Sequence, residues 1–110
     1  MKATYVIEGI PGETQRVAAT DVVQQFVAGI TALNGAPAIG AIIFCEDNNV
    51  RYTFVSDPTQ GANPIGHLLY PGTEITLGGG RLVREFRFIN EVLATVGTLQ
   101  VTPLFEVGRV

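Results

Sequence analysis

The stretch AIGAIIFCEDNNVRYTFV, residues 38–55, decides the fold class of this chain. Its first half is apolar at consecutive positions, so we expect a central strand covered on both faces by the chain itself, or on one face by a neighbouring subunit. Its second half alternates, which predicts a strand with Val50, Tyr52 and Phe54 on one face. The polar residues 46–49 between the halves tolerate left-handed backbone, so the two strands are expected to form a β-hairpin.

The rest of the chain repeats this pattern of short apolar blocks separated by Gly, Pro, Asn and Asp, which is typical of strands joined by turns. About seven strands with a turn roughly every ten residues predict an all-β fold. We expect a small antiparallel β-sandwich or jelly roll, formed by residues 1–110 as one domain, with at most one short helix. The other strands are predicted at residues 3–9, 14–19, 73–77, 81–89 and 97–107.

One segment, residues 20–33, favours a short helix or an irregular structure over a strand. Thr20 or Asp21 could cap a helix there, and the apolar residues that follow have helical spacing. This is the only helix that we expect in the chain.

Proline and glycine residues mark the predicted turns and sheet edges. The pair Pro11-Gly12 suits a type II turn. The glycines at positions 78–80 are expected to close a hairpin between two strands. The polar segment 56–64 is predicted to be an exposed loop. Pro103 cannot donate a backbone hydrogen bond, so we place it at a sheet edge or a bulge.

The composition indicates which kinds of partner are expected for the chain. Hydrophobic residues make up 46% of the chain and charged residues 15%, against about 25% in typical soluble domains. We therefore expect another chain to cover part of its surface. The net charge is −3 and the basic residues form no cluster beyond Arg81, Arg84 and Arg87, so no nucleic-acid partner is expected. The longest apolar run, residues 36–45, is about half the length that spans a bilayer, so we expect no membrane partner.

The residues that carry most catalytic chemistry are scarce. The chain has one serine, one cysteine and one histidine: Ser56 lies in the polar loop, and we expect Cys45 to be a small buried hydrophobe. His67 alone cannot supply a jelly-roll metal site. We predict no enzyme activity, no catalytic residue, no metal site and no cofactor. A pair of carboxylates brought together from distant strands is the one catalytic arrangement that the spacing leaves open.

The segments VRYTF, PIGHLLYPGTEITLGG, LVREFRFI and TLQVTPLFE follow one another between about residues 51 and 106. In this order they resemble small structural proteins of tailed bacteriophages. The resemblance implies a non-enzymatic virion component with a β-sandwich or jelly-roll fold, foremost a capsid decoration or cement protein. Such a protein is made in the host cytoplasm and sits on the capsid exterior. Its implied partners are the major capsid protein and copies of itself, as a dimer or trimer.

Two chain ends and two arginines are candidates for contact with partners. Segments 1–7 and 99–110 could add edge strands to a neighbour. Arg84 and Arg87 could bind acidic groups on a partner, or could be ordinary sheet-surface charges. The candidate interface residues are Arg84, Arg87, Leu104, Phe105 and Val107.

Two other functions stay open at this stage. A head-to-tail connector, tail or fibre-attachment protein would share the fold class. A small-ligand or carbohydrate-binding β-sandwich module belongs to a different class and would need a concave pocket.

Overall fold

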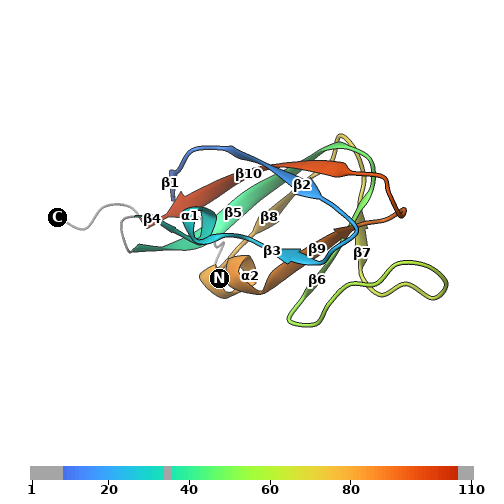
Figure 1. The fold of residues 1–110 in the computed structure, drawn as a ribbon. Coiled ribbons are helices and arrows are strands. Elements are labelled where there is room, and N and C mark those ends of the chain that lie inside the picture. Colours follow the sequence, from blue (N-terminus) through green and yellow to red (C-terminus); the bar gives the residue numbers. More distant parts are fainter. Residues whose placement is uncertain (1–8, 34–35, 107–110) are drawn as a thin grey trace, which may run out of the picture.

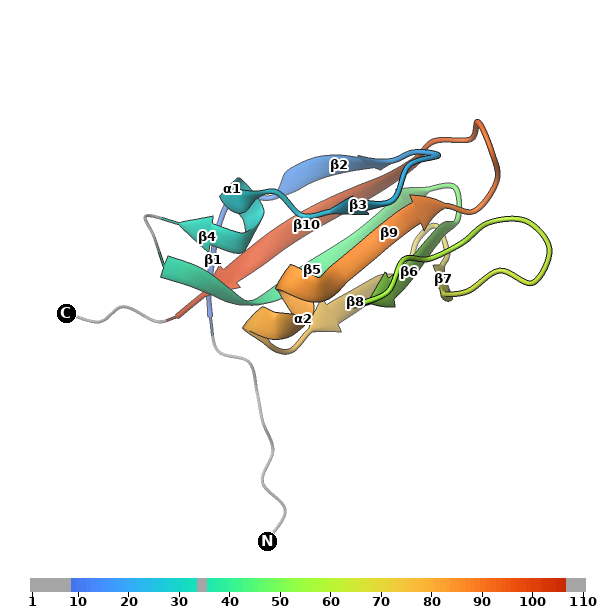
Figure 2. The ribbon, with the colours of Figure 1, turned by 60° about the horizontal axis from the view of Figure 1, so that its bottom comes forward.

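The computed structural model describes residues 9–33 and 36–106 of the 110-residue chain. Its strands form two sheets in which all neighbouring strands are antiparallel, and the sheets stack as two layers in Figure 1 and Figure 2. A single hydrophobic cluster draws side chains from both sheets. The predicted small antiparallel β-sandwich is therefore confirmed. Neither helix in the described ranges is long and apolar enough to cross a membrane.

The larger sheet is built around β10, which pairs with β5 on one side and with β1 and β2 on the other. The far side of β5 pairs with β8 and β4. The strands of this sheet are β1 (Ile10–Pro11), β2 (Gln15–Ala19), β4 (Ala32–Leu33), β5 (Ala36–Asp47), β8 (Glu74–Leu77) and β10 (Gly97–Phe105).

The smaller sheet has the order β3-β9-β6-β7 and supplies the aromatic part of the core. The Phe86 ring lies 5.1 Å from the Phe26 ring and 5.3 Å from the Tyr52 ring, between centroids. Such ring pairs add about 0.5–1.5 kcal/mol each to the free energy gained by burial. The strands are β3 (Gln24–Gln25), β6 (Val50–Phe54), β7 (His67–Leu69) and β9 (Phe86–Asn90).

The central position predicted for the apolar strand is confirmed, because β5 has partners on both edges. Only one of its faces is fully covered by the chain: Ile43 and Cys45 are fully buried, whereas Ile42 and Phe44 are half-buried. The prediction that a neighbouring subunit covers the other face stays a prediction.

The predicted hairpin at residues 46–49 is wrong, because β5 and β6 belong to different sheets. The connection crosses from one layer to the other instead of pairing the two strands. Asn48 does adopt left-handed backbone, with φ of 53°. Left-handed backbone at an asparagine is common to hairpins and to other tight connections, so it could not distinguish the two.

The predicted hairpin at residues 78–80 is also wrong, and residues 80–85 form the helix α2 (Gly80–Glu85) instead of a strand. This helix carries the chain from β8 in the larger sheet to β9 in the smaller one. Val83 on α2 is fully buried, so the helical turn plugs this end of the core. A Cβ atom at Gly80 would lie 2.7 Å from the Ala38 carbonyl oxygen, so the close crossing requires glycine.

The two proline predictions need correction. Pro11 lies in β1 and Gly12 is not left-handed, so no type II turn forms there. Pro103 lies inside the sheet and not at its edge, although a register shift follows at Leu104. The Pro103 carbonyl accepts a hydrogen bond from the Gly12 N–H (2.8 Å), so its nitrogen faces the same side. On that side the neighbouring strands are interrupted between β1 and β2, and the missing donor is tolerated.

The segment at residues 20–33 contains a short helix, as preferred, but it begins later than expected. It runs through β3, the single helical turn α1 (Ala28–Thr31) and β4, and with α2 the fold has one more short helix than predicted. Thr20 and Asp21 cap neither helix. The strand expected at residues 3–9, apart from Gly9, lies outside the described residues.

Candidate functional site at the loop end of the sandwich

The connection between β9 and β10 presents three aliphatic side chains to solvent. Leu93 is 68% exposed, Val92 56% and Val96 50%. We call these three residues the apolar tip. Figure 1 and Figure 2 show that this connection lies at one end of the sandwich, opposite α1 and α2. Exposed aliphatic residues gathered on one loop are characteristic of an interaction surface, whereas scattered ones are not.

The backbone of the tip is fixed by Asp21, which precedes β3. Its Oδ1 atom accepts hydrogen bonds from the Ala94 N–H (2.8 Å) and from Asn90 Nδ2 (2.7 Å). The Thr95 N–H donates to the Val92 carbonyl (3.0 Å), which closes a turn, and Ala94 has a φ of 64°. The hydrogen bonds to Asp21 hold the alanine in this uncommon conformation.

Asn90, the last residue of β9, links the tip to two other segments. It is 1% exposed, and its N–H donates to the Thr20 carbonyl (3.0 Å). Gln60 Nε2 donates to the Asn90 carbonyl (3.0 Å) and also to Asn90 Oδ1. The side-chain oxygen and nitrogen of Asn90 therefore both have hydrogen-bond partners, as buried polar groups require.

The other side of the tip is held by the connection between β5 and β6. Asn48 Nδ2 donates to the Val96 carbonyl (2.8 Å), and the Glu91 N–H donates to the Asn49 carbonyl (3.2 Å). Glu91 also faces Arg51, with 3.5 Å between Oε2 and Nη2, and the Arg51 side chain is only 11% exposed. Polar contacts to Asp21 on one side and to Asn48 on the other thus hold the backbone of the tip, while its three aliphatic side chains are exposed to solvent.

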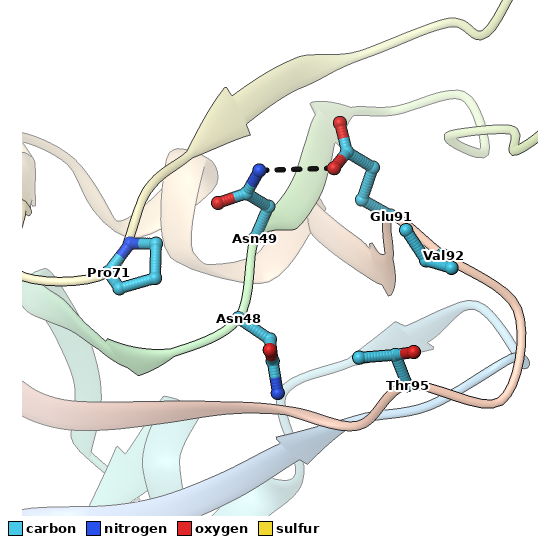
Figure 3. A pocket seen from close by; sticks show the side chains of 6 residues that line it. All are labelled: Asn48, Asn49, Pro71, Glu91, Val92 and Thr95. Carbon is cyan, nitrogen blue, oxygen red and sulfur yellow. Dashed lines mark hydrogen bonds between the residues drawn. The ribbon is translucent and has the colours of Figure 1, made fainter.

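Two hollows flank the tip. Figure 3 shows the first, of about 280 Å³, lined by Asn48, Asn49, Pro71, Glu91, Val92 and Thr95. Asn49 Nδ2 and Glu91 Oε1 are hydrogen-bonded across it (3.0 Å). The second hollow, of about 530 Å³, lies against Gln60, Gly61 and Leu93. The tip therefore stands between two recesses that a partner's side chains could enter.

Two ionisable groups near this end, Asp21 and Cys45, have shifted pKa values that keep their hydrogen bonds in place. The hydrogen bonds from the Asn90 side chain and from the Ala94 N–H lower the pKa of Asp21, so its carboxylate stays ionised and keeps accepting them. Burial, and then the charge of Asp47, raises the pKa of the Cys45 thiol to about 11. The Cys45 Sγ donates to the Asn48 carbonyl (3.1 Å). The prediction that Cys45 is buried is confirmed.

The predicted interface residues are spread over the fold. Leu104 and Phe105 lie in β10 and are 8% and 6% exposed, so the chain itself covers most of their surface. Arg84 is exposed on α2. Val107 lies outside the described residues.

Arg87, in β9, pairs with Asp57, with 2.7 Å between Nη1 and Oδ1. The partner of this guanidinium is thus within the chain. The structure does not bring Arg87 and the β10 residues together into one surface.

His67 lies exposed at the start of β7, with its ring centroid 5.4 Å from that of Tyr52. Within residues 9–33 and 36–106, no three His, Cys, Asp or Glu side chains are placed so that they could hold a metal ion. Sequence reasoning missed the apolar tip altogether. The signal available was the segment VLATVG after a strand, which is too short to form another strand before β10.

The sequence matches no protein-family model, and no curated protein and no solved structure matches it either. The function has to be argued from the surface of the molecule itself.

Proposed function

We propose that this chain is a non-enzymatic structural protein that attaches to a larger protein assembly by burying apolar surface. The apolar tip is the observation that supports this function. Its side chains are half or more exposed, while a hydrogen bond from its Ala94 N–H to Asp21 and one from Asn48 to its Val96 carbonyl fix its backbone. A surface that is already ordered loses little conformational entropy on binding. Each Å² of apolar area buried there contributes about 25 cal/mol before association costs.

The specific form that we propose is a capsid decoration or cement protein of a tailed bacteriophage. It rests on the resemblance of residues 51–106 to structural proteins of such phages. The low charged fraction of 15% supports it, because a chain with so little charge gains from being covered by others. In this role the chain binds the major capsid protein on the capsid exterior, as a dimer or trimer, without nucleic acid or membrane.

The test uses virions of the phage that encodes the chain. Virions are purified with the wild-type chain or with Leu93→Asp, and the chain is quantified against the major capsid protein on a stained gel. We expect wild-type copies in a fixed ratio to the capsid protein and at least about tenfold fewer for Leu93→Asp. Ile65→Asp is the matched control, because Ile65 is 58% exposed but lies outside the tip. Equal incorporation of all three chains would overturn the role of the tip, and absence of the wild-type chain would overturn the virion assignment.

Heat resistance separates the decoration function from its nearest alternative. Capsids that lack a decoration protein should assemble and then burst at a lower temperature than complete ones. Unchanged heat resistance with few copies per particle would instead favour a connector, tail or fibre-attachment protein.

The pocket in Figure 3 favours a second candidate, a small-ligand or carbohydrate-binding module. Its amide and hydroxyl groups are suited to bind sugar hydroxyls, and its volume of about 280 Å³ is close to the lower end of ligand sites. A glycan array is the direct test. Binding that Thr95→Val abolishes would support this candidate, and no binding would leave the structural role.

A further inference from the structure

The end of the sandwich opposite the tip carries a second exposed surface of a different charge. Leu82 on α2 is 40% exposed, and Val27, whose carbonyl accepts the Ile30 N–H at the start of α1 (2.9 Å), is 64% exposed. Arg81 and Arg84, also on α2, are exposed. Neither forms an ion pair with another residue in the described ranges. We call Val27, Arg81, Leu82 and Arg84 the basic end.

The apolar tip has the opposite charge at its margin. Asp21 touches the backbone of the tip, is exposed, and accepts hydrogen bonds only from uncharged N–H groups. No cation pairs with it among the residues that the structure describes. One end therefore offers aliphatic side chains beside a carboxylate, and the other offers aliphatic side chains beside two guanidinium groups, and none of these charges has an ion-pair partner among the described residues.

We propose that the apolar tip of one copy docks on the basic end of a second copy. Leu93 would pack against Leu82 and Val27, and Asp21 would face Arg81 or Arg84. This inference rests on the proposed function, in which the tip is a binding surface. It names a second copy of the chain as the partner that the tip contacts within an oligomer, while a tip left free at the end of an open chain stays available to the capsid protein.

Charge decides between this head-to-tail contact and a symmetric contact of two tips. A symmetric contact would bring two Asp21 carboxylates together, and like charges across an interface oppose binding. A head-to-tail contact pairs each carboxylate with a guanidinium group, in which bidentate hydrogen bonds are available. Such heterologous contacts form a closed ring when the rotation from one copy to the next returns the last copy to the first, and an open chain when it does not. The symmetric dimer does not fit this contact, and because the two surfaces lie at opposite ends of the molecule, a trimer forms either as an open chain or as a ring in which each copy is rotated relative to the last.

The test measures mass against concentration by light scattering after size-exclusion chromatography. The wild-type chain should form trimers or larger species as its concentration rises. Leu93→Asp at the tip and Leu82→Asp at the basic end should each raise the dissociation constant at least about tenfold. Ile65→Asp should leave it unchanged. Far-UV circular dichroism checks that each variant is folded, and Arg81→Glu with Arg84→Glu replaces Leu82→Asp if that variant is unfolded.

Mixing the two monomeric variants distinguishes the two geometries. The basic end of the Leu93→Asp chain is intact, and so is the tip of the Leu82→Asp chain, so the mixture should form one-to-one dimers and nothing larger. A wild-type monomer at all concentrations, an unaffected Leu93→Asp oligomer, or a mixture without dimers would each overturn the proposal.

The outcome is separate from that of the proposed function. Monomers that still enter virions through the tip would refute head-to-tail association and leave the structural role standing. Oligomers that never associate with virions would do the reverse.

Discussion

Replacing Asn90 by alanine is expected to lower the free energy of unfolding by about 2 kcal/mol. The side chain is buried, donates to the Asp21 carboxylate (2.7 Å) and accepts from Gln60. A hydrogen bond to a charged group contributes about 1.5–3 kcal/mol and a neutral one about 0.5–1.5 kcal/mol. Asp21 is exposed and Gln60 is half-buried, so water replaces part of what they lose. The expected loss therefore lies at the lower end of the sum.

Urea unfolding followed by circular dichroism measures this loss by linear extrapolation. A loss of about 2 kcal/mol corresponds to a fall of roughly 8 °C in melting temperature for a domain of this size. Gln100→Ala is the matched control, because its amide bonds Glu46 (3.0 Å) at an exposed position and should change stability by less than about 0.5 kcal/mol. If Asn90→Ala loses as little stability as the control, the hydrogen bonds of the Asn90 side chain do not stabilise the fold as argued.

The isosteric variant Asn90→Asp tests the same site by charge. It keeps the acceptor for Gln60 but places a second carboxylate against Asp21. The pKa of a buried carboxyl beside a like charge is raised, so the destabilisation should be full at pH 7 and relieved as the pH falls toward 4. Equal stability loss at both pH values would contradict the contact with Asp21.

Three further changes have defined outcomes. Gly80→Ala should cost about 1–3 kcal/mol in urea unfolding, because the new Cβ would lie 2.7 Å from a β5 carbonyl oxygen, whereas Gly79→Ala meets nothing within 4 Å and should be nearly neutral. Burial raises the pKa of Cys45 to about 11, so the stability that the protonated thiol contributes is complete below pH ~8.5 and is lost as the pH rises through 11. A thiol reagent at pH 8 should label Cys45 only after the protein is denatured. The hydrogen bond from Asn90 lowers the pKa of Asp21, so the stability that the Asp21 carboxylate contributes is present above pH ~4 and is lost as the pH falls. The melting temperature of Asp21→Asn should therefore depend less on pH in that range than the melting temperature of the wild type does.

The strands were predictable because their signal is local. Alternation placed Val50, Tyr52 and Phe54 on one face, and all three lie in the core or pack against it. A period of two residues reports which side of a strand is buried, whatever its partner. This is why the fold class could be predicted from the sequence.

The pairing of those strands was not local, and here the predictions failed. Residues 46–49 and 78–80 have the chemistry of hairpin turns, yet both connections cross between sheets. A turn motif fixes the backbone angles of a few residues but not the layer that the next strand joins. At the second crossing the chain forms a helical turn, which buries Val83 at the end of the core.

The candidate site escaped prediction for a related reason. The segment that holds Val92, Leu93 and Val96 is apolar, and apolar residues in a β protein are assigned to the core by default. Its exposure follows from contacts with Asp21 and Asn48, which are distant in the sequence and polar. No local pattern reveals that such residues will hold an apolar loop away from the core.

The distribution of the apolar surplus bears directly on function. A chain with 15% charged residues could spread its exposed aliphatic groups evenly, in which case they would promote nonspecific association. Here half of the ten large hydrophobic side chains that are exposed in the described residues belong to the tip or to the basic end, whereas Ile10, Val22, Val55, Ile65 and Tyr70 lie outside both. Charges of opposite sign at the two margins reject like pairs of ends and favour unlike ones. In the proposed head-to-tail contact, this small number of charges would specify which surfaces meet, as an assembly with a defined geometry requires.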